Sequence, residues 1–294
     1  MKDLVVITGA NSLLAKKVSL ILEDKFKIRF LTTSKKLIDN KKYFYWNTSK
    51  NQIDKNCLNS CSHIIHLAGY SILKRWSKKN QKIMYDSRIN GSNLLLKACK
   101  ENNHFPKTFI SASAVGIYSS NEDIVTENSP KNKDWLGNLA QEWENTANKF
   151  KKYDSRIVKL RISLIFSKKA GFLKYNLLSM KLGLGAVLGN QNRRINWMHI
   201  DDIANFIKSS INDIRYNGPY NLSTDKCITQ QKLIRLIKKK LYPYCLIIKI
   251  PKFIPKLILG ERYKVIDQDF EINNSKLKKT GFKIKYNNID QVIV

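Results

Sequence analysis

The chain has 294 residues, of which 43% are hydrophobic, and this length and composition exclude an intrinsically disordered protein. No apolar run approaches the roughly 20 residues of a membrane span, and the N-terminus lacks a signal-peptide cleavage site, so we expect a cytoplasmic protein without membrane contact. The formal net charge is +30, yet only ten of the 53 basic residues are arginine and they are spread along the chain, which indicates a composition bias and not a nucleic-acid partner.

The first fifteen residues predict a buried strand that turns directly into a helix. Residues 4–7 form an unbroken apolar run, and after Gly9 the apolar residues take helical spacing. Free N–H groups at such a helix start can bind the pyrophosphate of a dinucleotide. The spacing Gly9-x-x-Ser12-x-x-Ala15 keeps only the first glycine of the usual pattern, so an ordinary strand–turn–helix remains open. The expected cofactor contacts of this turn are Gly9, Asn11, Ser12, Leu13 and Leu14.

A second strand is expected over residues 27–33, and its end bears on the choice of cofactor. An acidic residue there favours NAD, whereas a basic one accommodates the 2′-phosphate of NADP. The strand is followed by Lys35 and Lys36 and by no acidic residue. We therefore expect NADP, with NAD possible, in contact with Thr33 and Lys35.

The chain continues with short strands at residues 43–46 and 62–67, the latter closing on His66-Leu67-Ala68-Gly69. Small residues at this strand end allow the backbone to approach a ligand closely. His66 is either a catalytic base or a semi-buried residue at the strand end, and the second interpretation is favoured.

Further strands and helices alternate up to residue 162. The pattern predicts helices over 78–101 and 136–150 and strands over 108–111 and 156–162. Such alternation requires an α/β fold of the Rossmann type, with a doubly wound parallel sheet.

From residue 163 onward the pattern loosens into a glycine-containing segment on the expected substrate side, with a polar run at 190–194. A helix over 203–211, a strand around 220–222 and a helix over 229–241 follow. We expect an NAD(P)-binding domain over 1–225 and a small C-terminal cap domain over 226–294.

Several short motifs, taken in order, resemble the extended short-chain dehydrogenase/reductase superfamily, and within it the YfcH-like group of epimerase family proteins. They lie at residues 7–10, 66–69, 75–76, 87–88, 111–118, 143–144, 182–185, 197–202, 259–261 and 281–282. The resemblance implies an NAD(P)-binding oxidoreductase or epimerase that acts on a small polar substrate, of which a sugar is one option.

The same resemblance indicates that this chain lacks the residues that the superfamily uses for catalysis. The superfamily uses a Tyr-x-x-x-Lys pair, which falls here on Leu136 and Ala140, and its helix asparagine falls on Arg88. What remains is Ser113, near the position of the serine that polarises the substrate, with Ser111 as the alternative.

One tyrosine near that serine could still carry catalysis. Tyr118, a turn later, either acts as an acid/base with Ser113 or packs over the cofactor. Ser113 and Tyr118 are therefore the candidate catalytic residues, although packing of Tyr118 over the cofactor is the favoured interpretation of that residue. Further cofactor contacts are expected from Leu67, Ala68, Gly69, Arg88 and Ser111.

The lost pair also motivates an alternative of another class, a catalytically silent nucleotide-sensing or interaction protein, related to cell division. Near the late helix, His199 with Asp201 and Asp202 could form a catalytic dyad, but capping of that helix by one of the aspartates is favoured. The five cysteines lack metal-ligand spacing and are expected to be reduced thiols, so no metal is expected. The oligomeric state is open between monomer and homodimer.

Overall fold

The structure, a computed structural model, describes residues 2–293, which divide into two compact units. The first unit takes in the chain up to Ile117 together with Lys133–Arg161 and Ala204–Tyr220. The second takes in Tyr118–Asn132, Ile162–Ile203 and the chain from Asn221 onward. Residues 226–294 thus share a compact unit with earlier segments, and an independent domain over 226–294 remains a prediction.

The first unit is built on a sheet of eight strands in the order β13-β8-β6-β5-β1-β2-β3-β4. The strands are β1 Leu4–Thr8, β2 Lys27–Thr32, β3 Tyr43–Asn47, β4 Gln52–Ile53, β5 Cys61–His66, β6 Thr108–Ala114, β8 Arg156–Ile162 and β13 Gly218–Leu222. The β1 strand pairs in parallel with β2 and β5, β2 with β3, and β5 with β6, whereas β4 pairs antiparallel with β3. The α/β fold with a largely parallel sheet, expected from the sequence, is confirmed.

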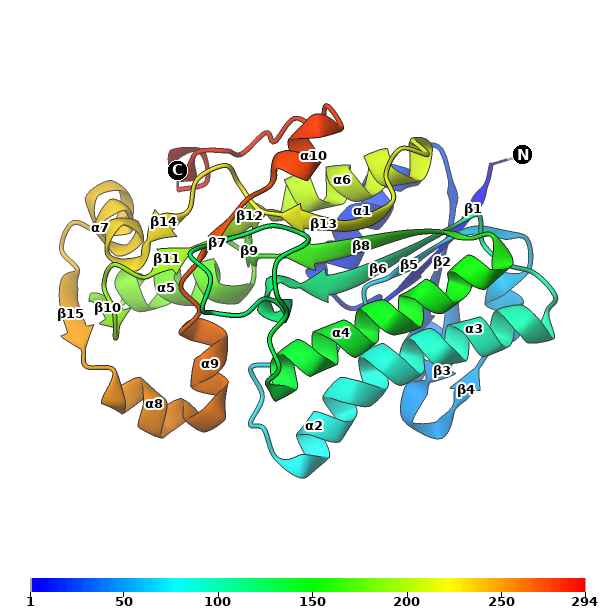
Figure 1. Ribbon diagram of the computed structural model, residues 1–294, viewed down its shortest axis with the longest axis horizontal. Coiled ribbons are helices and arrows are strands. Elements are labelled where there is room, and N and C mark those ends of the chain that lie inside the picture. The colour runs from blue at the N-terminus through cyan, green and yellow to red at the C-terminus, as the bar shows by residue number, and fades with distance from the viewer. Residues whose placement is uncertain (1, 294) are drawn as a thin grey trace. The chain divides into compact units, whose positions relative to one another are not determined.

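Helices cover both faces of this sheet (Figure 1). They are α1 Leu13–Leu22, α2 Lys78–Tyr85, α3 Gly91–Glu101, α4 Trp135–Asn148 and α6 Ile200–Asn212. In Figure 1 α3 and α4 lie in front of the sheet, and α1 and α6 lie behind it. This arrangement brings the carboxyl ends of β1, β5 and β6 to one edge, where ligands bind in such sheets.

The helix expected over 78–101 is interrupted in the middle. Residues Asp86–Asn90 form a π-helical turn between α2 and α3. A π turn inserts an extra residue into the helix and is frequently found at functional sites. Arg88 lies within this turn.

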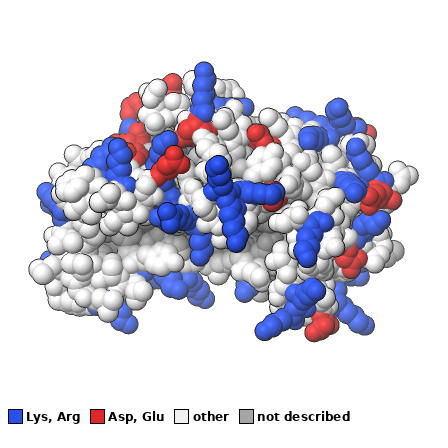
Figure 2. Space-filling model, turned by 90° about the horizontal axis from the view of Figure 1, so that it is seen from below, with Lys and Arg blue, Asp and Glu red and all other residues white. Residues whose placement is uncertain are grey.

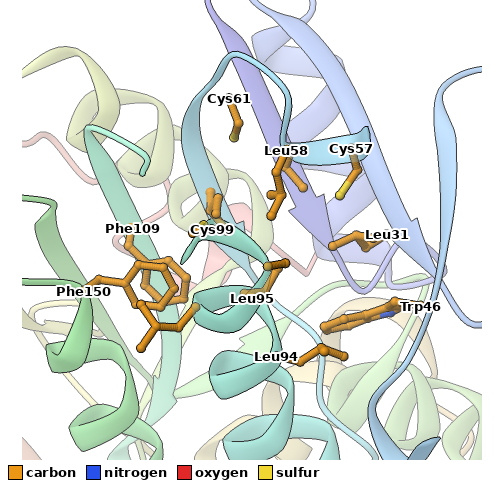
Figure 3. Close-up of a cluster of buried hydrophobic side chains, with 14 of the residues drawn as sticks. Leu31, Trp46, Cys57, Leu58, Cys61, Leu94, Leu95, Cys99, Phe109 and Phe150 are labelled. Atoms are coloured by element: carbon orange, nitrogen blue, oxygen red, sulfur yellow. The ribbon is translucent and has the colours of Figure 1, made fainter. Parts of the chain in front are cut away.

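The core of the first unit lies between the sheet and α3 and α4 (Figure 3). Phe109 of β6 and Phe150 stack with ring centroids 4.0 Å apart. Burial raises the pKa of the Cys61 and Cys99 thiols to about 12, which keeps them protonated and unreactive at neutral pH. All five cysteines are free thiols.

The second unit contains four two-stranded ladders and several short helices. Its strands are β7 Ile124–Val125, β9 Leu164–Phe166, β10 Leu184–Leu188, β11 Arg194–Ile195, β12 Trp197–His199, β14 Ile228–Thr229, β15 Leu246–Ile250 and β16 Glu271–Ile272. Its helices are α5 Gly171–Lys181, α7 Gln230–Leu241, α8 Phe253–Leu259, α9 Tyr263–Ile266 and α10 Ser275–Lys279. The β7–β16, β9–β12 and β10–β15 pairs are parallel, and β11–β14 is antiparallel.

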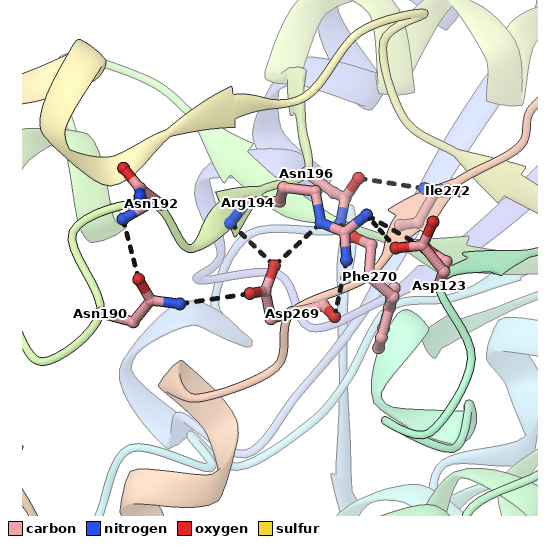
Figure 4. Close-up of polar contacts among 8 residues, drawn as sticks. All are labelled: Asp123, Asn190, Asn192, Arg194, Asn196, Asp269, Phe270 and Ile272. Carbon is pink, nitrogen blue, oxygen red and sulfur yellow. Dashed lines mark hydrogen bonds and ion pairs between the residues drawn. The ribbon is translucent and has the colours of Figure 1, made fainter.

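Within the second unit, Arg194 joins segments that are far apart in sequence (Figure 4). Its Nε donates to Asp269 Oδ1 at 2.9 Å, and its Nη1 donates to Asp123 Oδ1 at 2.6 Å. Asn196 adds a further link by donating to the Phe270 carbonyl at 2.7 Å. The end of the polar run at 190–194, expected on the substrate side, therefore has a structural role as well.

Among the helices of residues 2–293, none combines the length and the apolar character needed to cross a bilayer.

Candidate functional site

The turn after β1 depends on its glycine. Gly9 has a φ of +76°, a conformation that side chains other than glycine rarely adopt. A Cβ at this position would also lie 3.1 Å from backbone atoms of Leu67 and Ala68. The turn after β1 and the turn after β5 are therefore in direct contact, and only glycine permits that contact.

The same turn leaves backbone donors free at the start of α1. The Ser12 N–H donates to the Gly9 carbonyl at 2.8 Å, and the Ser12 side chain accepts from the Ala15 N–H at 3.1 Å as the N-cap. Within residues 2–293, no protein acceptor is found for the N–H groups of Leu13 and Leu14. Free donors at a helix N-terminus are what an anion requires.

A closed set of hydrogen bonds fixes the ends of β1 and β5. Thr8 Oγ1 accepts from the N–H groups of Leu67 at 3.1 Å and Ala68 at 3.0 Å. It also lies 2.9 Å from His66 Nδ1, and His66 Nε2 lies 3.3 Å from the Arg88 carbonyl. A carbonyl can only accept, so Nε2 carries the ring proton and the Thr8 hydroxyl donates to Nδ1.

This network settles the role of His66. The side chain is fully buried, and burial lowers its pKa to about 4, so the ring is neutral at pH 7. Both ring nitrogens are occupied by protein partners, which leaves neither for a substrate proton. The favoured interpretation as a strand-end residue agrees with the structure, although the ring is fully buried and not half-buried.

The end of β2 carries the residues expected to select the cofactor. Thr33 and Lys35 are both exposed, and Lys35 opens a short 3₁₀ turn. Thr32 fixes the bend before them by accepting from the Ser34 N–H at 3.1 Å. The Thr33 and Lys35 side chains are therefore accessible to a ligand at this strand end.

Arg88 lies against the turn after β5. Its Nη1 donates to the carbonyls of Tyr70 at 2.9 Å and Met84 at 3.1 Å, and its guanidinium carbon lies 5.0 Å from the centre of the Trp143 ring. Burial lowers the pKa of the Arg88 guanidinium to about 10, which still leaves it charged at pH 7. The structure therefore places a mostly buried cation beside Gly69.

At the end of β6, Ser113 is connected to a buried ion pair. Its hydroxyl donates to Glu144 Oε1 at 2.9 Å. Arg161 donates two hydrogen bonds of 2.7 and 3.0 Å to the same carboxylate, and Lys159 Nζ lies 3.5 Å from Glu144 Oε2. Ser111, the alternative to Ser113, instead donates to the Ala112 carbonyl at 3.0 Å.

The charge state of Glu144 follows from these neighbours. Burial raises its pKa, but the Arg161 hydrogen bonds and charge, with Lys159 and Ser113, outweigh burial and leave the pKa below its usual value. Glu144 is therefore an anion at neutral pH that orients the Ser113 hydroxyl, and it is a poor proton acceptor.

Comparison with known proteins assigns the chain to a family. The sequence profile of the NAD dependent epimerase/dehydratase family matches residues 5–223. An epimerase family protein of Staphylococcus epidermidis is 30% identical over 98% of this chain and 97% of its own length. The chain belongs to the NAD dependent epimerase/dehydratase family. The membership expected from the sequence motifs is confirmed.

Solved structures of this superfamily share the fold. The human epimerase family protein SDR39U1, solved with NADPH, superposes with a TM-score of 0.84 at 19% identity, over 99% of this chain and 97% of that one. A short-chain dehydrogenase/reductase superfamily protein of Agrobacterium tumefaciens, solved with NAD, gives a TM-score of 0.76 at 15% identity, over 99% and 94%.

In this family member the α4 face that would carry Tyr-x-x-x-Lys is apolar. Leu136, Ala140 and Trp143 are all buried and are spaced along one face of α4. None of these three side chains can transfer a proton. The Arg88 guanidinium lies over the Trp143 ring of this face.

Tyr118, expected to be catalytic, belongs to the second unit. It is fully buried, and its hydroxyl donates to the side-chain oxygen of Asn221. The Asn221 N–H is in turn bound by Glu127 at 2.9 Å. A catalytic role for Tyr118 remains a prediction, and it requires this buried hydroxyl to change partner.

The expectation for the aspartates before the late helix is wrong. α6 begins at Ile200, so Asp201 and Asp202 lie inside its first turn and not at its cap. Asp202 instead accepts from the N–H groups of Lys285 at 2.9 Å and Tyr286 at 3.0 Å. Its role is to hold the C-terminal segment within the second unit.

Thr8 and Arg161 belong to the site but were not predicted from the sequence. Thr8 ends a strand that is otherwise entirely apolar, and Arg161 lies in a strand whose neighbouring residues are buried. A polar or charged residue at a buried strand position needs a partner, and this is the signal that could have identified both residues.

Proposed function

We propose that this chain binds NADP(H), with NAD(H) as the weaker alternative, at the carboxyl ends of β1, β2 and β5. The observation that supports this most directly is the turn at Gly9, which contacts the turn after β5 and leaves the Leu13 and Leu14 N–H groups free. These donors would hold the pyrophosphate, assisted by the N-terminal dipole of α1. Asn11 and Ser12 line the same turn, and Leu67, Ala68 and Gly69 follow β5. Arg88 lies in the π turn beside Gly69, and Ser111 lies within β6.

The activity that we propose is oxidoreductase or epimerase chemistry on a small polar substrate. When bound, the nicotinamide supplies hydride transfer. The chain supplies Ser113, whose hydroxyl donates its one hydrogen bond to Glu144. The lone pairs of the Ser113 oxygen therefore remain able to accept a hydrogen bond from a substrate hydroxyl. Glu144 then acts as a positioning residue that keeps Ser113 in this orientation.

Titration calorimetry with NADP⁺ and NAD⁺ tests the cofactor. We expect both to bind and NADP⁺ to bind more tightly. Lys35→Ala should weaken NADP⁺ binding several-fold and leave NAD⁺ unchanged, because only the 2′-phosphate reaches this side chain. Lys42→Ala, an exposed lysine in the same unit, is the control of equal charge. The proposal would be overturned if neither NADP⁺ nor NAD⁺ bound at millimolar concentration.

Turnover tests the catalytic assignment. The measurement is nicotinamide absorbance during a screen of sugar and hydroxy-acid substrates. We expect Ser113→Ala to lower kcat by about tenfold to a hundredfold. Tyr118→Phe tests the other proposed catalytic residue separately and should also lower kcat. Unchanged turnover in Ser113→Ala would remove this serine from the reaction.

A further inference from the structure

The guanidinium of Arg88 is only partly hydrogen-bonded by the protein. Only its Nη1 is committed, to the carbonyls of Tyr70 and Met84. Within residues 2–293, neither Nε nor Nη2 has a protein acceptor, and no acidic side chain pairs with the guanidinium. The side chain is largely buried yet keeps some access to solvent.

The acidic residue two positions earlier is occupied elsewhere. Asp86 accepts from Lys82 Nζ at 3.0 Å and from Asn90 Nδ2 at 2.7 Å. Asp86 and Arg88 therefore have different hydrogen-bond partners. Among residues 2–293, no acidic side chain is paired with the positive charge of Arg88.

The chain makes room for the guanidinium at the end of β5. A Cβ on Gly69 would lie 3.0 Å from both Cζ and Nη2 of Arg88, closer than ordinary contact allows. The φ of Gly69 is not positive, so close approach is what demands glycine here, and backbone conformation does not.

A mostly buried guanidinium without an anion is costly, and its free nitrogens match two oxygens of one oxyanion. We propose that Nε and Nη2 of Arg88 bind an oxyanion, a phosphate or a carboxylate, of the ligand held at the carboxyl end of β5. This inference rests on the proposed function, because it adds a ligand class to the same site. The oxyanion belongs either to the dinucleotide or to an acidic substrate.

Arg88→Met tests the inference, and the chain offers a close control in Arg29. Arg29 Nη1 also donates only to carbonyls, those of Asn56, Cys57 and Asn59, and its guanidinium lies 5.3 Å from the centre of the Phe44 ring. Arg29→Met thus removes the same charge and the same kind of main-chain contact away from the carboxyl ends of the strands.

Calorimetry would compare both variants with the unchanged protein, using NADP⁺, inorganic pyrophosphate, and malonate added to the NADP⁺-loaded protein. We expect Arg88→Met to lose about tenfold to a hundredfold in affinity for at least one probe, and Arg29→Met to lose none. A loss confined to NADP⁺ and pyrophosphate assigns the oxyanion to the cofactor. A loss confined to malonate assigns it to the substrate.

A second variant keeps the charge and moves it. Gly69→Ala should displace the guanidinium and reproduce the weaker binding of Arg88→Met, whereas the fold is retained because the φ of Gly69 suits alanine. Equal affinities of Arg88→Met and Arg29→Met for every probe would overturn the inference. If NADP⁺ binding to the unchanged protein is absent, the proposed function fails, and the pyrophosphate comparison still decides the role of Arg88.

Discussion

Thr8 and His66 hold two strand ends with side-chain bonds that backbone pairing cannot provide. The Thr8 hydroxyl uses its one proton and both lone pairs, and the His66 ring uses both nitrogens. Because every donor and acceptor in this set is paired, protonation of His66 cannot be accommodated without breaking a bond to Thr8.

The first prediction therefore concerns acid stability. The pKa of His66 is about 4 in the folded protein and near 6.5 in the unfolded chain. Between these two pH values the unfolded chain therefore binds a proton that the folded protein does not bind. Stability should fall by about 3 kcal/mol as pH drops from 6.5 to 4, and it should be fully present above 6.5. Urea unfolding of His66→Gln at several pH values should show a shallower dependence on pH.

A comparison variant is needed, because burial also lowers the pKa of His63 to about 4. His63→Gln should flatten the same pH range by its own share, and the double variant should flatten it further. An unchanged pH dependence in His66→Gln would show that the ring is not held neutral by the fold.

The second prediction concerns the buried carboxylate. Glu144→Gln removes the buried anion that Arg161 and Lys159 both contact, so it should lower the free energy of unfolding by about 3–5 kcal/mol. Guanidinium chloride unfolding measures this loss. The double variant Glu144→Met with Arg161→Met should recover part of it, because one of the two buried cations is removed together with the carboxylate. A double variant less stable than Glu144→Gln would contradict this.

At the scale of elements, the start of α1 combines a structural cap with a ligand position. Ser12 caps the helix with its hydroxyl, while its Cβ occupies a place where glycine is usual in dinucleotide turns. Capping favours a hydroxyl side chain at position 12, whereas close approach of the phosphates favours glycine there.

The third prediction separates these roles. Ser12→Ala should cost about 1 kcal/mol of stability and Ser12→Gly only a few tenths, because glycine is itself tolerated at the N-cap. Ser12→Gly should also bind NADP⁺ several-fold more tightly, because the Cβ no longer crowds the phosphates. Thermal unfolding and calorimetry give the two quantities. Weaker binding by Ser12→Gly than by Ser12→Ala would show that the Cβ is not the obstacle.

The elements also show what the sequence could and could not predict. The buried strand at residues 4–7 and the turn at Gly9 follow from local composition alone. The π turn at 86–90 does not, because one inserted residue leaves the apolar spacing on either side nearly unchanged. The hydrogen bond from Tyr118 to Asn221 joins residues 103 positions apart, so no local sequence pattern indicates that the Tyr118 hydroxyl already has a partner.

At the scale of the whole molecule, the basic charge shows no single focus on the face drawn in Figure 2. Figure 2 shows Lys and Arg side chains scattered over the face in view, with few acidic ones among them. A surface that reads nucleic acid gathers such charge into a patch or stripe. The scatter agrees with the composition bias inferred from the excess of lysine over arginine.

The final prediction concerns how the chain divides. One hydrophobic cluster in the second unit draws Phe166, Val187 and Trp197 from before residue 225. It draws Leu233, Ile237 and Val292 from after that residue. Cutting the chain between 225 and 226 would expose both halves of this cluster, so neither fragment can bury its apolar residues alone.

We therefore expect that residues 226–294, expressed alone, lack a cooperative thermal transition by circular dichroism. Residues 1–225 alone should show exposed apolar surface by dye binding. Mixed, the two fragments should associate and regain a single cooperative transition, because association rebuilds the shared cluster. A cooperative transition in isolated 226–294 would instead establish these residues as the independent cap domain expected from the sequence, and would place the determinants of its stability outside the shared cluster.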